Sequence, residues 1–145
     1  MTHNAVGDKS SRALTNAERL ELVDQHRDAA KWAVANGPRG KGLRNAIILA
    51  AIGRAYYHVV DHNRLRRFCD VFASGLSEGK DESAAIVLRN YFIAKGSGTA
   101  GGSALWRDSF MKSMNAIAYF MRSQPITVIK KVSDEAYPLK KTRKH

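Results

Sequence analysis

A glycine-rich segment is the first place where the residue types could do chemistry. Gly96–Ser103 contains the pattern G-x-G-x-x-G and precedes a predicted helix. In dinucleotide-binding folds, such glycines follow a buried parallel strand, and the pyrophosphate rests on the helix N-terminus. Arg89 and Asn90 would interrupt that strand, which weighs against this interpretation. A P-loop is rejected because Gly102 replaces its lysine. Anion binding by the free helix amides and a simple flexible connection both stay open, and the connection is favoured.

Two histidines and one cysteine are the other candidate reactive groups. His58 and His62 are four residues apart, so one continuous helix would place them on the same face, as in several zinc sites. No third ligand is evident, and a helix cap at Asp61 or His62 explains the same residues, so we expect no metal and no cofactor. Cys69 lies in an apolar-periodic segment and is predicted to pack in the core. No combination of nucleophile, base and orienting group is visible, so we expect no enzymatic activity.

Basic residues make the broadest signal. Twenty-four Lys and Arg oppose thirteen Asp and Glu, which gives a net charge of +11 and a pI of about 10.1. Such a charge attracts polyanions or acidic protein surfaces. The candidate phosphate contacts form one cluster at the start of a predicted helix, one on the next helix and one in the C-terminal tail: Arg39, Lys41 and Arg44; Arg64, Arg66 and Arg67; and Lys140, Lys141, Arg143 and Lys144.

Apolar periodicity predicts an all-α, single-domain bundle of about five helices. The first helix begins at a capping box, Thr15–Glu18, carries Leu20 and Val34 among its apolar residues, and ends where Asn36 or Gly37 takes a left-handed cap. The second runs from Leu43 to about Val60. It is rich in alanine and apolar almost all round, so we expect it to be central.

The remaining helices complete the bundle. The third is predicted to be capped near Asp61 and closed by Gly75. Two amphipathic segments within Asp81–Pro125 then form an αα-hairpin that packs against the central helix. Phe110 and Ile117 lie on the apolar stripe of the last helix and are predicted to be core residues.

Three regions follow from this pattern. Residues 1–14 are polar and predicted to be a flexible N-terminal segment, and 15–125 form the helical domain. Residues 126–145 are an extended arm and a basic tail, although the β-branched run Ile126–Ile129 could also be a short strand. The longest apolar run, Ala46–Ile52, is too short to span a bilayer, and no secretory signal is evident. We therefore expect a cytoplasmic protein without membrane contact.

The second half of the chain resembles a known class of proteins. Val87–Lys95, the glycine-rich break, and a helix ending in aromatic residues before Gln124-Pro125-Ile126 are similar to small helical proteins encoded by tailed bacteriophages. The resemblance implies a bacterial host cytoplasm and a role in phage replication, regulation or host takeover. It assigns no functional residue.

Two functions follow from these observations. The first is non-enzymatic binding of DNA or RNA through phosphate contacts, with little base specificity evident. The alternative is a phage-encoded protein that binds and modulates a host enzyme or defence complex through its basic face. The sequence leaves open the choice between DNA, RNA and an acidic protein, as well as the oligomeric state.

Overall fold

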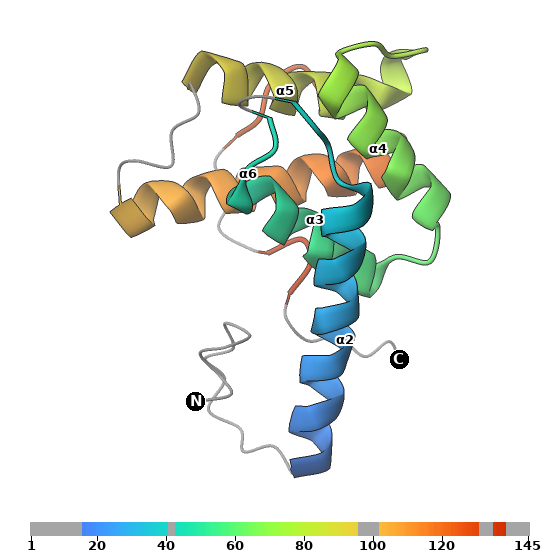
Figure 1. Cartoon of the computed structure of the whole chain (residues 1–145). Coiled ribbons are helices and arrows are strands. Elements are labelled where there is room, and N and C mark those ends of the chain that lie inside the picture. Colours follow the sequence, from blue (N-terminus) through green and yellow to red (C-terminus); the bar gives the residue numbers. More distant parts are fainter. Residues whose placement is uncertain (1–15, 41–42, 96–101, 131–134, 139–145) are drawn as a thin grey trace.

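The protein is a bundle of α-helices. The computed structural model describes residues 16–40, 43–95, 102–130 and 135–138, and these contain no strand. The elements, shown in Figure 1, are α2 (Asn16–Asn36), α3 (Ala46–His58), α4 (His62–Ser74), the short 3₁₀ helix η1 (Lys80–Glu82), α5 (Ser83–Lys95) and α6 (Gly102–Met121). The predicted all-α class is confirmed. No helix within the described ranges combines the length and apolar character needed to cross a membrane.

Helix α3 is the centre of the bundle, as its composition predicts. It packs against α2 and α6, and its apolar residues Ile47, Ile48, Ala51 and Ile52 are at most 1% exposed. It begins three residues later than predicted because Asn45 caps it, accepting a hydrogen bond of 2.9 Å from the Ile48 amide. It ends at His58, where Val59 adopts an extended conformation.

Helices α5 and α6 form the predicted hairpin. They pack together and run in opposite directions in Figure 1, and α6 also packs against α3. Phe110 is 5% exposed and Ile117 is fully buried, which confirms both as core residues. The dinucleotide interpretation, which the sequence already disfavoured, is excluded because the segment before the glycines is the helix α5 and not a parallel strand. Residues 96–101 lie outside the described part, whereas the amides of Ser103–Leu105, to which the anion-binding interpretation refers, lie in the first turn of α6. Anion binding there stays a prediction.

The caps of α4 match the sequence prediction. Asp61 accepts a hydrogen bond of 3.0 Å from the Arg64 amide, and Gly75 ends the helix in the left-handed conformation with φ of 76°. The predicted capping box of α2 cannot be compared, since Thr15 and the side chain of Glu18 lie outside what is described.

The predicted left-handed end of α2 is wrong. Neither Asn36 nor Gly37 has a positive φ. Gly37 is required for space instead, because a Cβ there would lie 2.4 Å from the Ala33 carbonyl oxygen and 2.7 Å from Leu49 Cδ2. Leu49 belongs to α3, so the glycine allows the end of α2 to approach that helix closely.

The fully buried apolar positions of α2 are small residues, and the half-buried Trp32 packs beside them against the core. Ala29 and Ala33 are each 1% exposed, whereas Leu20 and Val34 are 67% and 54% exposed. Leu20 lies in the N-terminal half of the helix, which projects beyond the other helices in Figure 1, whereas Val34 lies near the C-terminal end on the face that points away from the core. The predicted apolar positions Leu20 and Val34 are therefore not part of the core.

Part of the C-terminal arm belongs to the core. Residues 126–130 form no strand, and Ile126 and Ile129 pack against the buried cluster. Further along, Tyr137 is 9% exposed, and its carbonyl accepts a hydrogen bond of 3.0 Å from Arg54 on α3. The arm thus returns to the central helix before the basic tail begins.

Candidate nucleic-acid interface

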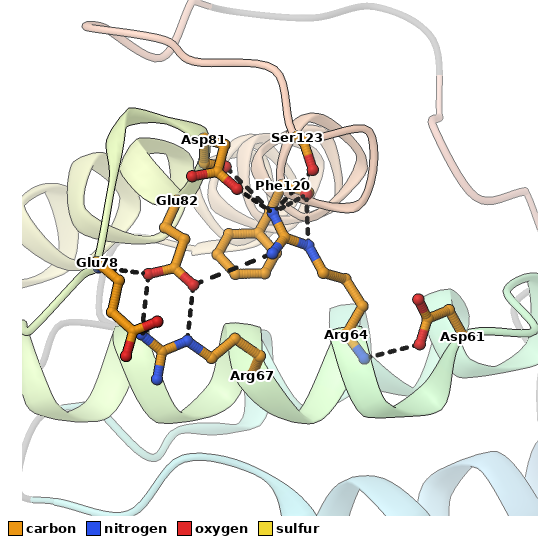
Figure 2. Close-up of polar contacts among 8 residues, drawn as sticks. All are labelled: Asp61, Arg64, Arg67, Glu78, Asp81, Glu82, Phe120 and Ser123. Atoms are coloured by element: carbon orange, nitrogen blue, oxygen red, sulfur yellow. Dashed lines mark hydrogen bonds and ion pairs between the residues drawn. The ribbon is translucent and has the colours of Figure 1, made fainter.

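Arg64, a predicted phosphate contact, is held inside the fold (Figure 2). Its Nε and Nη2 donate hydrogen bonds of 3.2 and 3.0 Å to the Phe120 carbonyl, and its guanidinium carbon lies 4.1 Å from the centre of the Phe120 ring. Asp81 completes an ion pair at 3.5 Å. Arg64 therefore satisfies the C-terminal end of α6 and joins it to α4.

Arg67, another predicted phosphate contact, is paired with a buried carboxylate inside the fold. Its Nε and Nη2 donate to the two carboxylate oxygens of Glu82 at 2.7 and 2.9 Å, and Glu82 is 5% exposed. The hydrogen bond from Arg67 lowers the pKa of Glu82 below its ordinary value of 4.5, although burial opposes this shift. The same bond raises the pKa of Arg67. Contact with a phosphate would require Arg67 to leave a buried carboxylate without its partner.

Arg44 also closes a helix end. Its Nη2 donates to the Val34 carbonyl at 2.8 Å and its Nη1 to the Pro38 carbonyl at 3.1 Å, next to the end of α2. Arg89 serves α4 in the same way, donating to the Phe72 carbonyl at 3.0 Å. Together with Arg64, which donates to the end of α6, these arginines cover the last turns of three helices. Carbonyl groups there lack partners within the helix, and the helix dipole favours cations.

Two of the predicted contacts remain exposed and lie together. Arg39, after α2, and Arg66, on α4, line one groove of about 340 Å³, hereafter the Arg39–Arg66 groove. Arg66 donates to neutral acceptors, the side-chain oxygens of Asn36 and Asn63 at 3.3 and 3.4 Å. Among the described residues, no carboxylate lies within 4.0 Å of either guanidinium, although Asp70 also lines the groove.

The other predicted contacts lie outside the described residues. These are Lys41, which follows Arg39 by two positions, and the tail cations Lys140, Lys141, Arg143 and Lys144. Of the six candidates on the helical body, the structure thus holds Arg44, Arg64 and Arg67 in internal contacts and brings Arg39 and Arg66 to one groove.

The histidine pair does not share a helix face. His58 ends α3 and His62 begins α4, with an extended break between them. His58 Nε2 contacts the Pro138 carbonyl, and the His62 ring stacks on Tyr56 with centroids 4.1 Å apart. In the described part of the chain, no group of three His, Cys, Asp or Glu side chains is arranged to hold a metal ion.

Cys69 is a buried packing residue, as predicted. It is 1% exposed within the core, and burial raises the pKa of its thiol to about 12. A thiol with such a pKa is almost entirely protonated at neutral pH and is a poor nucleophile.

No family model, curated protein or solved structure matches this sequence. Function therefore has to be inferred from the charges and contacts of the chain itself.

Proposed function

We propose that this protein binds nucleic acid without enzymatic activity, through contacts between its cations and phosphate groups. The observation that carries the proposal is the Arg39–Arg66 groove, where two exposed guanidiniums from different segments line one groove and no carboxylate of the described residues pairs with either. Such groups release counterions when they bind phosphates, and this release supplies most of the affinity in non-specific binding.

The groove has a rigid frame. Pro38 and Gly37 are buried, and the Asn36 amide donates to the Trp32 carbonyl at 3.1 Å while its oxygen accepts from Arg66. Arg66 therefore needs little reordering to meet a phosphate, which lowers the entropic cost of binding.

The basic tail extends the proposed interface. Four cations occur within the six residues that follow Pro138, and Pro138 itself contacts His58 at the end of α3. The tail is thus attached to the body at a defined point, and its cations add phosphate contacts to those of the groove. If the resemblance to bacteriophage proteins holds, the nucleic acid is that of the phage or its bacterial host.

The test compares two charge-matched double variants. One removes the groove cations, R39Q with R66Q, and the control removes two exposed arginines elsewhere, R27Q on α2 with R122Q after α6. Affinity for a labelled oligonucleotide is measured by fluorescence anisotropy over a range of salt concentrations. For every phosphate that a variant no longer binds, the slope of log affinity against log salt should become shallower by about 0.9 for duplex or about 0.7 for a single strand.

We expect the groove variant to bind the oligonucleotide more weakly than the control variant does. Its slope of log affinity against log salt should also be shallower than that of the control. Equal losses in both variants would show that only the overall charge attracts nucleic acid and would contradict a site at the groove. Arg64 and Arg67 are unsuitable for this test, because their removal also breaks internal contacts. Thermal denaturation of each variant confirms that the fold is retained.

A further inference from the structure

A second cavity, of about 480 Å³, lies between α2, α3, α6 and the C-terminal arm, and we name it the Trp106 cavity. Its volume is within the range of small-molecule sites. Ala29 and Ala30 on α2 contribute only methyl groups and Gly53 on α3 has no side chain, which leaves room for a flat ligand. Helix α6 contributes two aromatic rings, those of Trp106 and Phe110.

The aromatic rings form a continuous surface beside a cation. Trp106 is half-buried and stacks on Phe110, with ring centroids 5.1 Å apart and planes inclined by 27°. The guanidinium carbon of Arg54 lies 5.4 Å from the centre of the Phe110 ring. Stacked aromatic rings next to cations are the usual components of sites for unpaired bases.

A small polar group completes the cavity. Glu135 pairs with Arg54 through one oxygen at 3.1 Å and with Arg107 through the other at 3.7 Å. Two cations and one carboxylate leave a positive charge, and Arg107 is the most exposed member, with 61% of its side chain accessible. Each Glu135 oxygen keeps a lone pair that can accept an N–H from a base.

From this arrangement we propose that the Trp106 cavity takes one unpaired base of a single-stranded nucleic acid. The base stacks against Trp106, an adjacent phosphate pairs with Arg107, and Glu135 accepts from the edge of the base. The proposal rests on the proposed function and names its substrate class. A duplex cannot fill the cavity while its bases remain paired and stacked.

The test uses the full-length protein and two strands with equal numbers of phosphates. These are a twelve-residue oligothymidylate and an abasic strand of the same length. Stacking of one base predicts that the unmodified protein binds oligothymidylate about 5- to 150-fold more tightly than the abasic strand. A blunt duplex of the same length should not bind more tightly, per phosphate, than the abasic strand does.

Three variants locate the effect. W106L removes the stacking ring, and A30L fills the cavity from an exposed position of α2 without disturbing the core. Both should abolish the preference for oligothymidylate while leaving the salt slope unchanged. W32L is the matched control, because Trp32 stacks on Tyr56 outside the cavity, and it should keep the preference.

The outcomes separate this proposal from the proposed function. Equal affinity of the unmodified protein for both strands would overturn base binding and leave phosphate binding intact. A preference that persists in both W106L and A30L would also overturn it. If no strand binds at low salt, the proposed function itself fails, and this proposal fails with it.

Discussion

At the scale of single residues, arginine performs two different tasks in this protein. Arg44, Arg64 and Arg89 satisfy carbonyl groups at the ends of helices, and Arg67 neutralises a buried carboxylate. The net charge of the chain is +11, but these four arginines are held in internal contacts and are not available to a ligand. Arg39 and Arg66, without carboxylate partners in the described part of the chain, keep their charge available.

The pair formed by Arg67 and Glu82 predicts a specific dependence of stability on pH. The pKa of Glu82 is lower in the folded protein than its ordinary value of 4.5. The unfolded chain therefore takes up a proton first as the pH falls below about 4.5, which removes the stabilisation that is present at neutral pH. E82Q lacks this ionisation but keeps a similar shape.

Urea unfolding of both proteins between pH 7 and pH 3 measures the effect. The free energy of unfolding of the unmodified protein should exceed that of E82Q at pH 7, and the difference should shrink below about pH 4.5. A difference that stays constant over this range would show that Arg67 and Glu82 do not form the ion pair in solution.

Helical geometry accounts for the different fates of the α4 arginines. At about 100° per residue, Arg67 lies about 60° from Arg64 around the helix, whereas Arg66 lies on nearly the opposite side. The three arginines are close in the sequence and were therefore predicted as one cluster. Their closeness in the sequence does not show that Arg66 lies on a different side of the helix from Arg64 and Arg67. The acidic residues Glu78, Asp81 and Glu82, soon after α4, were the available signal for an internal partner.

At the scale of elements, α6 is expected to contribute most of the packing energy of the hairpin. It contacts α3, α4 and α5, and Phe110 and Ile117 lie in its buried face. Truncation of either side chain to alanine leaves a cavity and should lower the free energy of unfolding by about 2–5 kcal/mol. The measurement is the urea midpoint of I117A and F110A, with L20A on the exposed part of α2 as the control. Midpoints no lower than that of L20A would contradict the described core.

The existence of the helices was predictable, but their mutual approach was not. Local signals such as the Asp61 cap, the left-handed Gly75 and the apolar period of α6 depend on nearby residues only, and they predicted the right elements. The role of Gly37 depends on Leu49 of α3, and that of Arg44 depends on a carbonyl ten residues earlier. The Trp106 cavity requires side chains from three helices and the arm. No local pattern contains such information.

At the scale of the whole molecule, a compact helical body carries a basic groove and a basic tail. Helices α2 and α4 frame the groove, and the arm contacts α3 just before the tail. The proposed binding of nucleic acid through these features would depend on charge, and its affinity should therefore fall as salt screens the phosphates and competes for them. A complex with a host protein would instead show a fixed stoichiometry that does not depend on nucleic acid.

The most direct test of the central claim is the affinity of the full-length protein for duplex and single-stranded oligonucleotides as a function of salt. We predict that log affinity falls linearly with log salt, with a slope of about −0.9 per phosphate contacted for duplex and about −0.7 for a single strand. Binding too weak to measure at physiological salt, together with one host protein that co-purifies at a fixed ratio after nuclease treatment, would contradict the claim.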